Sequence, residues 1–333
     1  MSFTVKDGER RISPLHLAPW VGTNEIFPAG IAPHLVKLGG DFFCAPFGQE
    51  LDGAPLHGWT ANSNWSVESK SEHAICARLD KLVKGASIVK EIELLPEHPL
   101  VYQRHTISGG SGEIQVANHA NVALPDGGLI RTSRKQFWAT PSDPLESDPA
   151  CGRSGLQYPA KSKTLDNFPA LEGTADLTQY PWFPEHEDFV LGLEDAGNQF
   201  GWTAVTRPAQ GDLFLSLRNT ASLPVTMLWH SNGGRDYPPW SGRHFGCLGV
   251  EEGVVSSMLP AAEQEAQTAP GSLPLADGQS FSVCHVIGAI DWPCKEAVQS
   301  IEQAQDHIVV TSTGGFQREI PFLAGFIGLN RNF

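Results

Sequence analysis

Residues 227–252 read MLWHSNGGRDYPPWSGRHFGCLGVEE, and this stretch points to both a fold class and a site. A short apolar run ends at Trp229, and a second run begins at Cys247 and leads to Glu251 and Glu252. The irregular segment between them is rich in Gly, Pro, aromatic and polar residues. We interpret the stretch as two strands joined by a loop that builds a site. Flat aromatic rings beside bidentate donors suit a sugar, because ring faces stack and hydroxyls form hydrogen bonds.

Further apolar runs lie on both sides of this stretch, and most alternate with a period close to two, which is typical of strands with one buried face. The predicted strands are 65–68, 74–79, 87–94, 100–107, 113–124, 189–192, 200–205, 213–217, 225–229, 281–288 and 308–311, and residues 39–48 are interpreted as a strand that enters a bend. Short turns between consecutive runs favour an antiparallel meander. One helix is predicted over 294–305, with Pro293 near its start and Ala297, Val298 and Ile301 on one face.

The composition favours an all-β protein. The chain of 333 residues is 41% hydrophobic and 18% charged, and its 34 Gly and 25 Pro indicate frequent turns. We therefore expect a large antiparallel β-sandwich with few short helices, in a single domain over residues 1–333. The weakly patterned segment 131–187 is interpreted as loops and short strands crossing one face, with an interdomain linker as the alternative.

The charge and the cysteines exclude several classes of function. A formal net charge of −14 argues against nucleic acid or an anionic membrane surface as partner. The chain starts with polar residues and has no apolar run of membrane-spanning length, so we expect a soluble, cytoplasmic protein. Six scattered cysteines lack CxxC spacing and are expected to be free, buried thiols. No closed zinc site, P-loop or nucleophile elbow is found, so neither a metal nor a cofactor is expected.

The candidate chemical residues are two histidines and one carboxylate. His57 follows a turn signal at Asp52-Gly53 and precedes Gly58, which would let a ligand approach the backbone, and the alternative is a hydrogen-bonded structural histidine. His119 lies on the polar face of its strand, which meets either bulk water or a polar cleft. Glu251 ends a buried strand, where a carboxylate is costly unless it is paired or functional. Its neighbour Glu252 is expected to face solvent.

Two arginines flank the segment Pro238-Pro239-Trp240, here called the aromatic loop. Arg235 and Arg243 could each clamp sugar hydroxyls or a phosphate, or could instead pair with Asp236 or Glu251.

Three motifs, in order, resemble the galactose mutarotase-like superfamily, which includes aldose 1-epimerases and hexose-phosphate mutarotases. Residues 45–48 read APFG and precede the pair His57-Gly58. Residues 118–124 read NHANVAL, similar to the phrase that carries the second histidine of the superfamily. Residues 249–251 read GVE, similar to the late strand that ends at its carboxylate. Asn62 stands where many relatives have an arginine after the His-Gly pair.

The resemblance implies a β-supersandwich and interconversion of the α and β anomers of an aldose. In that reaction Glu251 would be the base on the anomeric hydroxyl, His119 the acid on the ring oxygen, and His57 would orient the sugar. The implied substrate-binding residues are Asn62, Trp229, Arg235, Tyr237, Trp240 and Arg243. The implied ligand is a monosaccharide or sugar derivative, bound by a monomer or homodimer. The alternative is a non-catalytic sugar-binding protein, and a lyase or glycoside hydrolase is more distant because Glu251 lacks an evident second carboxylate.

Overall fold

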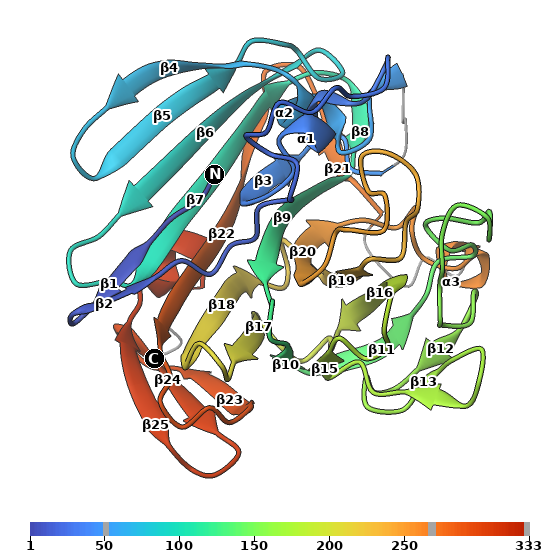
Figure 1. Ribbon diagram of the computed structural model, residues 1–333. Coiled ribbons are helices and arrows are strands. Elements are labelled where there is room, and N and C mark those ends of the chain that lie inside the picture. The colour runs from blue at the N-terminus through green and yellow to red at the C-terminus, as the bar shows by residue number, and fades with distance from the viewer. Residues whose placement is uncertain (49–52, 266–270, 330–333) are drawn as a thin grey trace.

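The strands of the protein form two large sheets packed face to face, as seen in a computed structural model that describes residues 1–48, 53–265 and 271–329 (Figure 1). Every ladder between its named strands is antiparallel, although isolated parallel bridges occur at Ala45–Gly58 and His186–Gly233. The predicted class, an all-β antiparallel sandwich with few short helices, is confirmed. None of the helices in the described ranges is both long enough and apolar enough to cross a membrane.

The larger sheet has nine strands. In spatial order they are β15 (Gln179–Tyr180), β10 (Gly128–Thr132), β17 (Phe200–Arg207), β18 (Asp212–Asn219), β22 (Ser280–Asp291), β7 (Leu100–Gly109), β6 (Ala86–Leu94), β5 (Ala74–Leu79) and β4 (Trp65–Lys70). Strands β5, β6 and β7 form the predicted meander, since each pairs with the next along the chain, and β4 extends it by one strand. The strand predicted over 113–124 does not continue this meander, because most of it lies in the other large sheet.

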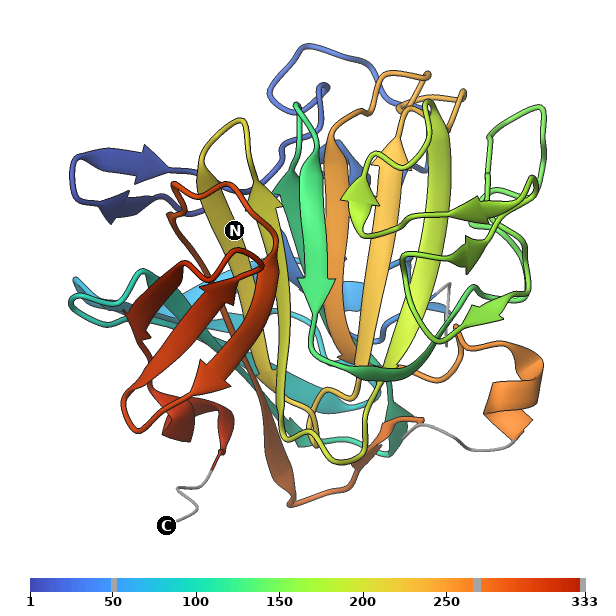
Figure 2. The same cartoon turned by 90° about the horizontal axis from the view of Figure 1, so that it is seen from below.

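The second sheet has seven strands and supports the candidate site. In spatial order they are β12 (Lys161–Ser162), β11 (Lys135–Ala139), β16 (His186–Glu194), β19 (Val225–Asn232), β20 (Cys247–Val254), β9 (Val116–Ala123) and β3 (Asp41–Cys44). The quoted stretch supplies β19 and β20 at the middle of this sheet, where they pair directly with each other. Figure 2 shows β16, β19, β20 and β9 side by side.

Small elements surround the two sheets. The strands are β1 (Val5–Asp7) with β2 (Arg10–Ile12), β13 (Phe168–Pro169) with β14 (Thr174–Ala175), β21 (Leu273–Leu275) with β8 (Gly112–Ile114), and the hairpins β23 (Val298–Gln303), β24 (His307–Ser312) and β25 (Gln317–Pro321). The helices are α1 (Pro33–Val36), α2 (Gly58–Asn62), α3 (Ala261–Glu265) and the 3-10 turn η2 (Ala324–Ile327).

The core between the sheets is made by alternate residues of facing strands. Fully buried side chains from both sheets meet there, including Val101, Phe214, Ile287, Val190, Leu228 and Val250. Burial of each such side chain contributes roughly 1.5–3 kcal/mol. Even-numbered residues of β20 therefore face the core, and odd-numbered ones face outward.

The outward face of the seven-stranded sheet is also covered. Residues of the N-terminal segment, including Trp20 and Leu38, pack over it together with Trp240 of the aromatic loop. Every residue of β20 is consequently buried. A strand buried on both faces lacks the polar–apolar alternation of a half-exposed strand, which explains the continuous apolar run before Glu251.

The helix predicted over 294–305 is wrong, because this segment contains strand β23. Val298 pairs with Ser312 and Ser300 pairs with Thr311, so Gln299 is an extra residue at a β-bulge. The bulge turns Val298 and Ile301 to the same buried side at a spacing of three. That spacing imitates the period of a helix.

The segment 131–187 forms loops and short strands, as predicted. Leu165, Phe168 and Leu177 pack in the core between the sheets, which argues against the linker alternative. The strand predicted over 113–124 is interrupted at Gln115, between β8 and β9. The turn predicted at Asp52-Gly53 lies partly outside the described residues.

All six cysteines are free, as expected. Only Cys44 and Cys247 are buried, and the other four are half-buried.

Candidate functional site

A cavity of about 480 Å³ lies on the outward face of the seven-stranded sheet. Its floor carries His119 of β9, Glu251 of β20, Trp229 of β19 and Phe189 of β16. These positions share one face because opposite residues of an antiparallel ladder point to the same side. The segment 28–38 and the loop 235–240 cover the floor.

His119 and Glu251 are direct neighbours across the β9–β20 ladder. His119 Nε2 lies 3.2 Å from Glu251 Oε1, and both side chains are almost fully buried at 1% and 2% exposure. Glu251 Oε2 and His119 Nδ1 have no hydrogen-bond partner. Phe42 stacks on the imidazole of His119, with ring centroids 4.5 Å apart. The pair is fixed in position and still has free polar atoms for a ligand.

His57 approaches the same pair from the loop before α2. Its ring meets the ring of His119 edge-on at 5.1 Å and the ring of His34 edge-on at 4.8 Å. The residue itself has a left-handed backbone, with φ of 65°. A Cβ on the next residue, Gly58, would lie 2.3 Å from the carbonyl carbon and oxygen of Ala45. The glycine therefore permits close packing of two backbone segments, and not the approach of a ligand as the sequence suggested.

Asn62 holds this loop without lining the cavity. Its amide nitrogen donates to the carbonyls of Leu56 and Gly58, at 2.8 and 2.7 Å. Its oxygen accepts from the backbone N–H of His34 and lies 3.0 Å from Nδ1 of that ring. His34 does line the cavity. No local pattern marks His34 as a site residue, because it reaches His57 through Asn62 and through ring packing across 23 residues.

An aromatic wall, formed by Trp229, Tyr237 and Trp240, closes one side of the cavity. Arg235 also lines the cavity, and its guanidinium lies over the ring of Trp240 at 4.7 Å. Arg235 Nη2 is 3.5 Å from Oε1 of Glu187. Glu187 is a buried carboxylate beside the site that was not predicted from the sequence.

The two arginines pair with other carboxylates than Asp236 and Glu251, the partners that the sequence offered as the alternative to clamping a ligand. Arg235 contacts neither Asp236 nor Glu251, since Asp236 pairs with Arg153. Arg243 does not line the cavity and pairs with Glu25 at the surface. The chain brings Glu25 to the loop from more than 200 residues away, and no local pattern reports such a contact.

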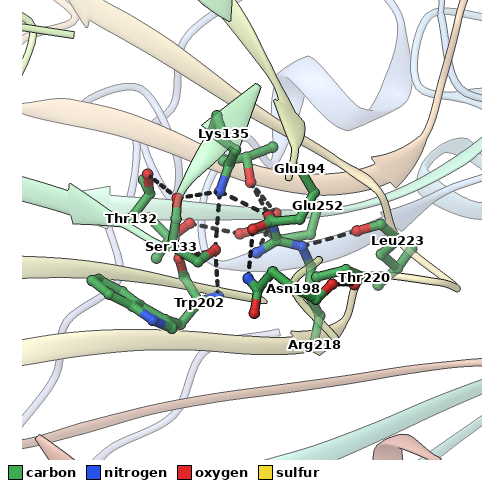
Figure 3. Close-up of polar contacts among 12 residues, drawn as sticks. Thr132, Ser133, Lys135, Glu194, Asn198, Trp202, Arg218, Thr220, Leu223 and Glu252 are labelled. Atoms are coloured by element: carbon green, nitrogen blue, oxygen red, sulfur yellow. Dashed lines mark hydrogen bonds and ion pairs between the residues drawn. The ribbon is translucent and has the colours of Figure 1, made fainter. Parts of the chain in front are cut away.

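Glu252 is not the solvent-facing residue that the sequence suggested. It is fully buried and points into the core, because neighbouring residues of a strand face opposite sides. Figure 3 shows it among Arg218, Glu194 and Lys135. Arg218 Nη1 lies 3.0 Å from Glu252 Oε2, and Lys135 Nζ lies 2.9 Å from Glu194 Oε2. Two cations and two carboxylates balance in charge below the cavity floor.

The cavity floor favours uncharged groups. Burial raises the pKa of Glu251 well above its ordinary value, and the nearby charge of Glu252 adds to this shift. Burial also lowers the pKa of His119 to about 3 and the pKa of His57 well below its usual range. Burial therefore favours the uncharged form of both side chains in the contact between His119 and Glu251.

Comparison with known proteins reveals a likeness in fold. No family model matches the sequence, and no curated protein matches it either. A candidate aldose 1-epimerase from Escherichia coli K12 is 13% identical over 87% of this chain and 98% of its own, with a TM-score of 0.55. A galactose mutarotase related enzyme from Lactobacillus acidophilus is 13% identical over 87% of this chain and 97% of its own, with a TM-score of 0.52.

The chain has the galactose mutarotase-like fold. A candidate aldose 1-epimerase from Klebsiella pneumoniae agrees, at 16% identity over 81% of this chain and 68% of its own, with a TM-score of 0.50. The mutarotase-like resemblance in the sequence thus predicted the architecture that the structure has.

Proposed function

We propose that the protein interconverts the α and β anomers of an aldose by general acid–base ring opening. What supports the proposal is that His57, His119 and Glu251, which lie far apart in the sequence, line one cavity on a mutarotase-like fold. Glu251 takes the proton of the anomeric hydroxyl, and His119 gives a proton to the ring oxygen. His57 orients the sugar, and the aromatic wall stacks on it.

The protons held by the His119–Glu251 pair balance over a reversible reaction. When the ring opens, one proton leaves the anomeric hydroxyl for Glu251 and one leaves His119 for the ring oxygen. The pair is then protonated Glu251 and neutral His119, which is the state that burial favours in the cavity. When the ring recloses on the other face of the aldehyde, both protons return. Burial thus stabilises the pair in the state that accompanies the open-chain aldehyde.

The charges around the cavity favour an uncharged sugar. Arg235 is the one arginine among the described lining residues, and it contacts Glu187. A phosphate group is usually held by several free cationic or N–H donors. We therefore propose a neutral monosaccharide as the substrate, in preference to a sugar phosphate.

The test is anomer exchange measured by NMR across a panel of neutral aldoses and the matching 6-phosphates. Wild type should accelerate exchange of a neutral aldose, and Glu251→Gln should reduce that acceleration by about 10²–10⁴-fold, the range for loss of a general acid or base. Glu72→Gln, at an exposed surface position, is the matched control and should match wild type. Equal rates for wild type and Glu251→Gln would show that Glu251 has no role in the reaction.

A non-catalytic sugar-binding protein is the second candidate. The burial of the His119–Glu251 pair favours it, because burial disfavours the ionised carboxylate that the role of base requires. This function predicts saturable binding of a sugar by calorimetry without faster exchange, in wild type and Glu251→Gln alike.

A further inference from the structure

A second cluster of chemically active side chains lies near the candidate site but outside the cavity. It consists of His16, His244 and Cys247, each of which offers one ligand atom, and these atoms lie within 4.8 Å of one another. None of the three lines the cavity. The mechanism proposed above uses none of them.

The backbone holds each of the three residues firmly. The N–H of His16 donates to the carbonyl of Asn121 at 2.7 Å, which ties the N-terminal segment to β9. The carbonyl of His244 accepts from Gly233 at 2.7 Å. Cys247 is the first residue of β20, and its N–H donates to the hydroxyl of Tyr180 at 2.8 Å.

Two ring nitrogens in the cluster are buried without a partner, namely Nε2 of His16 and Nε2 of His244. His244 as a whole is only 2% exposed. Buried polar atoms without partners are rare in folded proteins, so each one calls for an explanation such as an ion.

The hydrogen bond at Nδ1 sets the tautomer of His244. The hydroxyl of Ser231 donates to Glu187 Oε2 at 2.9 Å, so its oxygen accepts from Nδ1–H of His244 at 2.8 Å. Nε2, which is buried without a partner, is then left with a free lone pair. A carboxylate or hydroxyl that fixes the distal nitrogen of a histidine is the usual support of a metal-ligating imidazole.

We propose that His16, His244 and Cys247 bind one zinc ion. Two imidazoles and a thiolate form a ligand set that suits zinc, which prefers nitrogen and sulfur in a tetrahedral arrangement. Bonds of about 2.0–2.3 Å require the three atoms to close up by about 1 Å, which small rotations of the side chains supply. Water completes the coordination.

Binding releases a proton from the protein. Zinc binds the thiolate form of cysteine, so the Cys247 thiol loses its proton when the metal binds. The zinc–sulfur bond forms as the S–H proton leaves to solvent. The two histidines bind as neutral rings and release none, so one proton leaves for each zinc bound.

The ion would act on the cavity through the aromatic wall. The ring of His244 stacks on Trp229 with centroids 5.6 Å apart and an interplanar angle of 17°, and it meets Trp240 edge-on at 5.0 Å. Both tryptophans line the cavity. Zinc on His244 fixes the ring that supports this wall, so the ion holds the wall in place and takes no part in the ring opening.

The test is zinc binding by the full chain after dialysis against a chelator. Titration with zinc chloride should give one ion per chain, one proton released per ion, and a change in tryptophan fluorescence. Cobalt(II) in place of zinc should give the sulfur-to-metal absorption of a thiolate ligand. Cys247→Ser and His16→Gln should each weaken binding by at least about 100-fold, and Ser231→Ala by about 10–100-fold, as for loss of a supporting partner.

Cys44→Ser is the matched control, because Cys44 is equally buried and its Sγ lies 3.6 Å from Nδ1 of His57. It should bind zinc as wild type does. The proposal is overturned if wild type takes up no zinc, if Cys247→Ser binds as tightly as wild type, or if Cys44→Ser is the variant that loses the ion. Should Cys247→Ser fail to fold, the cobalt spectrum of wild type decides, since absence of the thiolate band also overturns the proposal.

Discussion

Replacement of Arg218 by methionine should destabilise the protein strongly, because Arg218 neutralises two buried carboxylates between the sheets (Figure 3). Its side chain contacts Glu252 and Glu194, donates to the Thr226 hydroxyl at 2.7 Å, and donates to the Leu223 carbonyl at 2.9 Å. Arg218→Met leaves Glu252 with hydroxyl partners only. Removal of one partner from a buried ion pair costs about 3–5 kcal/mol, a large part of a total stability of about 5–15 kcal/mol.

The assay is urea unfolding followed by tryptophan fluorescence and circular dichroism. Arg243→Met is the matched control, since Arg243 pairs with Glu25 at the surface with 41% of its side chain exposed. An exposed pair is worth about 0–1 kcal/mol. The double variant Arg218→Met/Glu252→Gln should regain part of the lost stability, because it removes the unpaired charge. If Arg218→Met lies within 1 kcal/mol of wild type, roughly the value of an exposed pair, the reasoning about the buried network is refuted.

Two further predictions concern pH and backbone packing. Burial lowers the pKa of His285 to about 3. The neutral ring therefore stabilises the folded protein above the ordinary histidine pKa of 6.5, and this stabilisation is lost as the pH falls toward 3. At pH 5 the loss in the free energy of unfolding is about 2 kcal/mol. Urea unfolding at pH 7 and pH 5 should show a decline that is smaller by this amount in His285→Gln, and equal declines would contradict the assignment. Gly58→Ala should destabilise the protein by more than Gly53→Ala, since both glycines have φ of +71° but only Gly58 faces the Ala45 backbone at 2.3 Å. Thermal unfolding of the two variants measures the difference, and equal losses would mean that the left-handed backbone alone, at about 1–2 kcal/mol, explains the effect.

The sequence predicted the sheets well because their signal is local. Strands β5, β6 and β7 each have one face more buried than the other, and the period of two in their side chains is visible in any window of six residues. The same periodicity led to a wrong helix at residues 294–305. The extra residue Gln299 at the bulge places the buried side chains of this strand three residues apart, which looks like the period of a helix. The mutarotase-like motifs supplied what periodicity could not, namely which histidines and which glutamate share a cavity.

The remaining errors at the site have one physical cause. Whether Glu252 faces solvent or core depends on how β20 pairs with β9 and on what covers each face of the sheet. Arg243 finds Glu25 and Arg235 finds Glu187 through contacts between distant segments. Such contacts are set by the packed fold, and short-range sequence patterns carry no record of them.

The adjacent carboxylates of β20 make the strand intolerant of slippage. A shift of one residue against β9 would send Glu251 into the core, opposite Arg218, and would bring Glu252 up beside the imidazole on β9. The number of buried charges of each sign would stay the same. Every apolar residue along the strand, however, would move to the opposite face of the sheet. An insertion or deletion of a single residue in this strand should therefore abolish both folding and ligand recognition. The same insertion or deletion in the exposed turn at Gly314-Gly315 should be tolerated.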